Sequence, residues 1–173
     1  MLGFVTTLES GAADRLLFSV AETLNARGCR LAGAVQINTE PVAGRVCDMD
    51  LMVLAGDRRV RISQNLGILS RGCRLDADAL ETAVGLVVQA LDAGAQLLVV
   101  NKFGRQEAEG RGFRPIIGRA LAGGVPVLTS VTHAKRPGFD SFAEDLGTEL
   151  PADIDAVLAW CNSACVASTH GVK

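Results

Sequence analysis

The feature that most constrains the fold is a short apolar run that leads directly into polar and charged residues. Residues 97–100 are all apolar, and the mostly polar segment 101–107 follows them. An apolar run of this length between turn-forming residues is typical of a strand buried on both faces, as in a parallel sheet covered by helices. Ligands of such sheets bind just beyond the carboxyl ends of the strands. The sequence therefore predicts an α/β fold with binding or catalytic residues after this strand: Asn101, Lys102, Arg105 and Glu107.

Strands and helices are expected to alternate along most of the chain. Short apolar runs predict strands at residues 2–6, 31–37, 97–100, 125–131 and 155–160. Apolar residues at helical spacing predict helices from a cap at Ser10 to Gly28, from a cap at Asp76 to Ala93, from Pro115 to Gly123, and around Phe139. This alternation predicts a three-layer α/β domain in which helices cover both faces of a mostly parallel sheet.

The middle of the chain has a different pattern from its flanks. Residues 46–54 and 59–63 each alternate polar and apolar side chains, which predicts a β-hairpin with one solvated face. We expect this hairpin to form a small β-rich insertion, about residues 42–64. A length of 173 residues suits a single domain, so residues 1–162 are expected to form one α/β domain and residues 163–173 a loose C-terminal tail.

Composition excludes several classes of protein. The 17 lysine and arginine residues nearly match the 19 aspartate and glutamate residues, which argues against general nucleic-acid binding. No apolar run reaches the roughly 18 residues of a membrane span. The first residues lack the basic and long apolar regions of a signal peptide, so we expect a cytoplasmic protein. Five cysteines without a CxxC pair predict free thiols in a reducing compartment, with no metal site.

The loop after the first predicted strand is one candidate anion site. Free backbone N–H groups and the helix dipole favour an anion where such a loop enters a helix. Aligned with the phosphate-binding pattern GxxxxGK[ST], Gly11-Ala12-Ala13 stands where Gly-Lys-[Ser/Thr] belongs, so the lysine and the magnesium-binding hydroxyl are missing. Glu9 also places a negative charge where phosphates would lie. The alternative is a plain strand-to-helix turn. The candidate ligand-binding residues here are Ser10, Gly11, Ala12 and Ala13.

The segment after the central strand is the second candidate. Asn101 occupies the position where a P-loop enzyme has its magnesium-binding aspartate, and a neutral amide is a poor metal ligand. Several cations follow or could fold over this segment, a combination that suits a phosphate, a carboxylate or another oxyanion: Lys102, Arg105, Arg111 and Arg114, with Arg71 and Arg74. The alternative is that these cations belong to an ordinary solvated loop.

Three further side chains have reactive chemistry. His133 follows the last core strand and could reach the same crevice as Asn101. Cys73 lies between two arginines, which can lower a thiol pKa, and Cys47 precedes an acidic segment. The alternative is a solvated histidine and ordinary free thiols.

The segment 101–107 resembles a motif of the small P-loop nucleoside-triphosphatases that are related to nucleotide kinases. That motif reads Asp-Glu-apolar-Gly-x-Met-Glu, and Gly104 and Glu107 match it. Asn101 replaces the metal-binding aspartate, and Lys102 replaces the acidic residue that is thought to activate water. The resemblance covers most of residues 1–131 and implies a P-loop fold with degenerate nucleotide-binding motifs.

The chain is also similar to a bacterial family that is known mainly as a domain of unknown function and is often encoded beside molybdate-transport genes. The similarity rests on Arg71–Asp76 and on Val100–Arg114, and it covers nearly the whole chain. It implies a link to molybdate or tungstate handling.

These observations favour a binding protein over an enzyme. Magnesium-dependent phosphoryl transfer needs a P-loop lysine, a metal-binding hydroxyl and an acidic metal partner, and all three are replaced here. We therefore expect no magnesium and no ordinary nucleotide hydrolysis. The expected ligand is a small oxyanion, either molybdate, tungstate or the phosphate of a nucleotide, held between residues 10–12 and residues 101–114. No nucleic-acid or membrane partner is expected.

Two alternatives stay open. In a divergent nucleoside-triphosphatase or kinase, Lys102 would stand in for the P-loop lysine and Glu107 would position water. In a partner-binding module, the site would be vestigial and an exposed apolar patch would bind a protein partner or a second copy of the chain.

Overall fold

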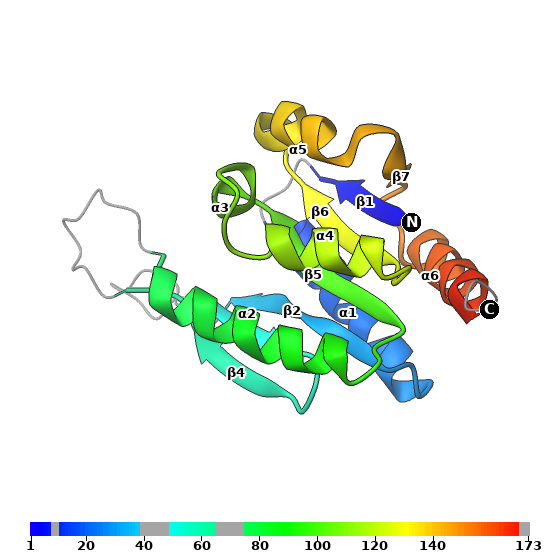
Figure 1. Cartoon of the computed structure of the whole chain (residues 1–173), viewed down its shortest axis with the longest axis horizontal. Coiled ribbons are helices and arrows are strands. Elements are labelled where there is room, and N and C mark those ends of the chain that lie inside the picture. Colours follow the sequence, from blue (N-terminus) through cyan, green and yellow to red (C-terminus); the bar gives the residue numbers. More distant parts are fainter. Residues whose placement is uncertain (8–10, 39–48, 65–74, 170–173) are drawn as a thin grey trace.

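The computed structural model describes residues 1–7, 11–38, 49–64 and 75–169. Within these residues, strands form one sheet in the order β4-β3-β2-β5-β6-β1-β7 (Figure 1). The strands are β1 (Leu2–Thr6), β2 (Leu31–Asn38), β3 (Met49–Val53), β4 (Arg58–Arg61), β5 (Leu97–Phe103), β6 (Val127–Val131) and β7 (Gly147–Leu150). The helices are α1 (Ala12–Ala26), α2 (Ala77–Asp92), α3 (Arg105–Ala108), α4 (Arg114–Ala122), α5 (Arg136–Ala143) and α6 (Ile154–Thr169), with short 3₁₀ turns η1 (His133–Lys135) and η2 (Glu144–Leu146).

The sheet is parallel except at one edge. β2, β5, β6, β1 and β7 pair in parallel, as the predicted strand–helix alternation requires. β3 pairs antiparallel with β2, and β4 pairs antiparallel with β3. The predicted mostly parallel sheet and its hairpin are therefore confirmed. β6 lies between β1 and β5, so the strands that precede the two candidate loops are separated by one strand.

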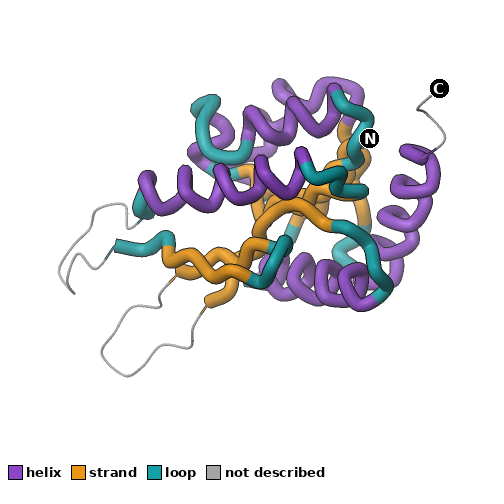
Figure 2. Tube along the Cα trace, turned by 60° about the horizontal axis from the view of Figure 1, so that its bottom comes forward, coloured by secondary structure: helices purple, strands orange, loops and turns teal. Residues whose placement is uncertain are grey.

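Helices cover both faces of the sheet and give the domain its three layers (Figures 1 and 2). Alternate residues of β5 point to opposite faces: Leu97 and Val99 pack with the apolar side chains of α1 and α6, whereas Leu98 and Val100 pack with those of α2, α4 and α5. Burial on both faces explains why β5 reads as an unbroken apolar run.

Local signals explain most of the helix boundaries. The Asp76 carboxylate caps α2 by accepting a hydrogen bond from the Ala79 N–H at 3.0 Å, and a proline stands in the first turn of α4. The cap predicted at Ser10 is wrong, because the N-cap position of α1 is Gly11, whose φ of 76° suits a residue without a Cβ.

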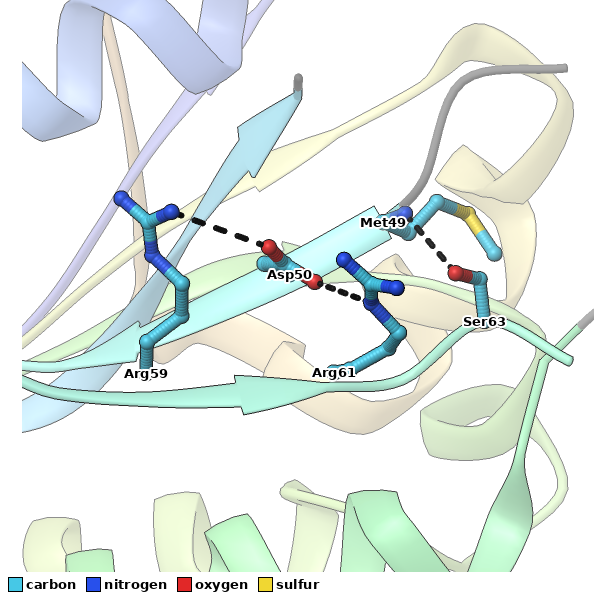
Figure 3. A network of polar contacts seen from close by, with 5 residues as sticks. All are labelled: Met49, Asp50, Arg59, Arg61 and Ser63. Carbon is cyan, nitrogen blue, oxygen red and sulfur yellow. Dashed lines mark hydrogen bonds and ion pairs between the residues drawn. The ribbon is translucent and has the colours of Figure 1, made fainter. Parts of the chain in front are cut away.

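The β3–β4 hairpin is pinned by a buried acid on the face that points away from α2 (Figure 3). The Asp50 carboxylate, 3% exposed, lies 3.2 Å from Arg61 Nε and 4.0 Å from Arg59 Nη1. The Ser63 hydroxyl accepts a hydrogen bond from the Met49 N–H at 3.1 Å. A buried charge is stable only when it is paired, so Asp50 fixes the register of the two strands.

The carboxyl-terminal part of the chain differs from the prediction. Residues 155–160 form the start of α6 rather than a strand, and α6 continues to Thr169, into the segment predicted as a loose tail. A short apolar run does not distinguish a buried strand from a helix. The Asp153 carboxylate supplies the missing signal, because it accepts a hydrogen bond from the Ala156 N–H at 3.0 Å, as a helix cap does. Strand β7 and helix α3 were not predicted, and β5 continues past Val100 to Phe103.

Strands β2 and β5 approach each other closely at one glycine. Gly33 pairs with Val99 and has a φ of 125°, and a Cβ added there would lie 1.9 Å from the Val99 carbonyl oxygen. No side chain fits at that distance, so Gly33 is required where the two central strands meet.

Replacing Gly33 with alanine is expected to lower the free energy of unfolding by about 3 kcal/mol, because the two strands must separate or the backbone must change its conformation. Urea denaturation of the purified variant measures this loss. Gly85→Ala is the matched control: Gly85 lies within α2 with open space around it, and alanine is expected to raise stability by up to about 1 kcal/mol. Equal midpoints for Gly33→Ala and the wild type would contradict this close approach.

Candidate functional site

A β-bulge shapes the carboxyl end of β5. Val100 pairs with Thr129 and Phe103 pairs with Val131, so three steps along β5 match two steps along β6. The extra residue falls at Asn101 and Lys102. A bulge bends a strand and redirects its side chains. Asn101 and Lys102 therefore belong to the strand rather than to the predicted loop, and they point to opposite faces of the sheet.

The Asn101 side chain is buried and is hydrogen-bonded through both its oxygen and its nitrogen. Its Oδ1 accepts from the Gln36 N–H at 2.8 Å, and its Nδ2 donates to Asp14 Oδ1 at 2.8 Å. The Asn101 carbonyl accepts from the Ser130 hydroxyl at 2.6 Å. One residue thus joins β5 to β2, to β6 and to the first turn of α1. A side-chain amide can donate to Asp14 and accept from β2 at once, whereas a carboxylate can only accept, which accounts for asparagine rather than aspartate at this position.

Lys102 is exposed and lies on the α2 side of the sheet. Its Nζ donates to Gln36 Oε1 at 2.9 Å. Gln36 is only 7% exposed, so a neutral amide holds the lysine at the edge of the sheet. Among the described residues no carboxylate lies within ion-pair distance of Lys102. Its positive charge is therefore not neutralised by those residues.

Glu107 is buried in the loop that follows β5. Its Oε2 accepts from the Gly104 N–H at 2.8 Å, and its Oε1 accepts from the Phe113 N–H at 3.1 Å. Gly112 makes room for this contact, since a Cβ there would lie 2.5 Å from Glu107 Oε1. Both carboxylate oxygens are used to close the loop from Gly104 to Phe113.

The arginines of this loop do not converge on one free space. Arg105 Nε donates to Glu109 Oε1 at 2.7 Å, and Arg111 also bonds the Glu109 carboxylate. These two guanidinium groups hold the pKa of Glu109 below its usual value. Arg114 lies over the Phe142 ring, 4.9 Å from its centroid, and bonds the Glu107 carbonyl. Lys102 is the cation of this group that lacks an acidic or aromatic partner among the described residues.

A cavity of about 450 Å³ opens beside Lys102 on the α2 side of the sheet. Its polar lining comes from β2, β5 and the following loop: Gln36, Asn101, Lys102, Gly104, Arg105, Gln106 and Glu107. Its apolar lining comes from the hairpin region, α2 and the end of the loop: Met49, Leu51, Ile62, Leu75, Leu80 and Phe113. A volume of this size falls in the range of roughly 300–1,000 Å³ that small-molecule sites occupy.

The structure brings together part of the predicted site. Asn101, Lys102, Arg105 and Glu107 lie along this cavity, whereas Gly11, Ala12 and Ala13 begin α1 on the other face and do not line it. Ser10, Arg71 and Arg74 lie outside the described residues. Sequence reasoning missed Gln36 and the apolar walls. The alternation of the hairpin predicted which of its residues face inward, but not that they face Lys102.

His133 begins η1 after β6, and its charge acts on the Glu149 carboxylate of β7. The hydrogen bond from Arg136 is the main cause that lowers the pKa of Glu149, and His133 adds to that effect. The predicted approach of His133 to the Asn101 crevice has no contact to support it.

The described cysteines are free thiols, of which Cys161 is buried and Cys29 and Cys165 are partly exposed. Burial raises the pKa of Cys161 to about 12 and that of Cys165 to about 11, and it also raises the pKa of Cys29. Thiols with such pKa values stay protonated and unreactive at neutral pH. Cys47 and Cys73 lie outside the described residues. Within the described ranges, no group of three or more acidic, histidine or cysteine side chains could hold a metal ion.

Replacing Glu107 with glutamine is expected to lower the free energy of unfolding by about 1–3 kcal/mol, because an amide can accept only one of the two backbone hydrogen bonds. Urea denaturation measures the loss, and faster hydrogen exchange at the Gly104 or Phe113 amide locates it. Glu109→Gln is the control on the exposed side of the loop, where a change within about 0.5 kcal/mol is expected. Equal losses of stability in the two variants would contradict the role of the Glu107 carboxylate in closing the loop.

Replacing Asn101 with aspartate is expected to cost about 3 kcal/mol at neutral pH, because two carboxylates then face each other in a buried site. Exchanging the pair, with Asp14→Asn and Asn101→Asp together, restores an amide opposite a carboxylate and is expected to recover part of the loss. A double-mutant cycle measured by urea denaturation gives the coupling free energy. Strictly additive effects would mean that the two side chains do not interact.

Comparison with known proteins adds a family. Residues 2–160 match the family model described as a protein of unknown function, DUF2478. Over 147 residues the chain is 37% identical to the molybdenum import ATP-binding protein ModC 2 of Bradyrhizobium diazoefficiens; the alignment covers 85% of this chain but only 16% of that relative. No solved structure matches.

The match and the three-layer sheet together confirm the predicted resemblance to P-loop nucleoside-triphosphatases at the level of the fold. In the described part of the chain, no helix is long and apolar enough to cross a membrane. Because the family model spans nearly the whole chain, the chain belongs to the DUF2478 family.

Proposed function

We propose that this protein binds a ligand that carries an oxyanion, either a nucleotide or an inorganic oxyanion, and does not hydrolyse it. The observation that carries the proposal is the Lys102 ammonium group at the mouth of the cavity. Its partner is a neutral amide, Gln36, at 2.9 Å, so within the described part of the chain no carboxylate competes with an incoming anion for this charge. A cation at the carboxyl edge of a parallel sheet is well placed to bind phosphate or carboxylate groups.

The residues present do not fit a magnesium–nucleotide centre. Ala12 and Ala13 replace the P-loop lysine and the metal-binding hydroxyl in the aligned pattern. The Asn101 amide is bonded at both ends, and both oxygens of Glu107 accept backbone N–H groups. Phosphoryl transfer depends on metal ions and on a group that orients the nucleophile. The enzyme alternative therefore has no observation in its favour, and binding is the better proposal.

A vestigial site with a protein partner is also less well supported. In the described ranges, the exposed large apolar residues are Met1, Leu146 and Ile154. Isolated apolar residues on a surface are normal and do not indicate an interface. The charged, partly apolar cavity is the more specific feature.

The similarity to ModC 2 suggests the cellular process in which the ligand is bound. The name of that relative refers to molybdenum import and ATP binding, but the aligned segment is 16% of its length. We therefore propose only that this chain acts in the handling of molybdate or tungstate. The ATP binding in that name refers to a much longer protein and is not carried over to this chain.

A thermal-shift screen tests the proposal. The purified protein is melted with molybdate, tungstate, sulfate, phosphate, ATP or GTP, each with and without magnesium. A ligand at 100 times its Kd adds about 2.7 kcal/mol of stability, which in a chain of this size raises Tm by roughly 5–10 °C. At least one ligand is expected to do so without magnesium.

Two lysine variants show whether the ligand binds at Lys102. Lys102→Gln is expected to lose most of the shift, whereas Lys135→Gln, in η1 after β6 and outside the cavity lining, is expected to keep it. A shift that requires magnesium and is accompanied by phosphate release would instead support the hydrolase. No shift with any ligand would overturn the proposed function.

A further inference from the structure

We infer that the ligand is an organic anion: its apolar or aromatic body enters the cavity, and its phosphate or carboxylate pairs with Lys102. The inference rests on the proposed function and narrows it. It means that the molecule in this cavity is not bare molybdate, tungstate or phosphate.

The walls of the cavity are chemically unsuited to an inorganic oxyanion. Leu51, Ile62, Leu80 and Phe113 line it and are at most 6% exposed. An inorganic oxyanion is strongly hydrated, and these side chains offer it no hydrogen bonds in place of water. A cavity of about 450 Å³ is also far larger than a tetrahedral oxyanion needs. Apolar walls of this kind stabilise a ligand in proportion to the apolar surface that it buries.

The polar groups lie along the sheet and the following loop. Gln36 and Lys102 point to the same side of the sheet, where Gln36 is buried and Lys102 is exposed. The cavity therefore has an apolar interior and a cation at its mouth. A ligand that matches this arrangement is amphiphilic, with an uncharged body of about nucleoside size and an anionic group at one end.

The apolar wall is a fixed part of the fold. Met49, Leu51 and Ile62 face the cavity, while Asp50 is paired with Arg59 and Arg61 on the opposite face of the hairpin (Figure 3). On the other side, the Glu107 carboxylate holds Gly104 and Phe113 in place. Two buried carboxylates thus help to hold the two sides of the cavity in place.

The test compares ligands that have the charge, the body or both. Isothermal titration calorimetry measures the binding of three kinds of ligand. 1-Naphthyl phosphate and AMP have both an organic body and an anionic group. Adenosine has only the organic body, and phosphate and molybdate have only the negative charge. At least one of the two phosphate esters is expected to bind about tenfold or more tightly than either inorganic anion, equivalent to about 1.4 kcal/mol. Naphthyl phosphate and AMP distinguish a general apolar body from a nucleoside.

Variants separate the two ends of the ligand. Lys102→Gln is expected to weaken ester binding several-fold and to leave adenosine unchanged, with Lys135→Gln as the control. Met49→Trp fills the cavity and is expected to abolish ester binding; Leu75→Phe blocks it independently in case the first variant does not fold. Circular dichroism and the Tm without ligand check folding.

The outcomes distinguish this inference from the proposed function. If phosphate or molybdate binds as tightly as both esters, depends on Lys102 and is unaffected by Met49→Trp, the protein binds oxyanions but the organic ligand is wrong. If AMP and adenosine bind equally and Lys102→Gln changes neither, the pairing with Lys102 is wrong. If no member of the panel binds, the inference is wrong, and the proposed function is overturned as well if the thermal-shift screen also finds no ligand.

Discussion

The structure of the candidate site depends on the side-chain amide of Asn101. It is buried between β5, β2 and α1, where it accepts from the Gln36 N–H and donates to the Asp14 carboxylate. In a low-dielectric interior, a group bonded at both ends holds its neighbours firmly, and an unpaired one is costly. The acid that a P-loop enzyme has on the central strand is absent here, while Asp14 lies one contact away on the helix. In this structure the Asn101 and Asp14 side chains bond each other and so join β5 to α1.

Two adjacent residues at the bulge in β5 have different environments, because successive side chains of a strand point to opposite faces. Asn101 points toward α1 and is buried, whereas Lys102 points toward α2 and is exposed. Gln36 connects them, because its N–H bonds Asn101 and its side chain bonds Lys102. The contacts that stabilise the sheet therefore also position Gln36, whose side chain accepts the hydrogen bond from the exposed Lys102 ammonium.

Local signals explain which parts were predictable. The Asp76 cap, the proline of α4 and the alternation of the hairpin are visible within a few residues, and the structure agrees with each. The strand predicted over 155–160 is wrong, because burial of an apolar run depends on what packs against it. The cavity could not be predicted, since it depends on β2 lying next to β5 and on a hairpin meeting a loop more than 40 residues later in the chain.

The position of β1 in the sheet has a consequence for how the chain folds. β1 is the first strand of the sequence, but its neighbours are β6 and β7, which end at Val131 and Leu150. During synthesis the apolar residues of β1 have no partner strand until β6 and β7 have emerged from the ribosome. Contacts between such distant segments slow folding and leave apolar surface open to aggregation. The hairpin and α2 are close in the sequence, whereas β1 can pair with β6 and β7 only after those later strands have been made.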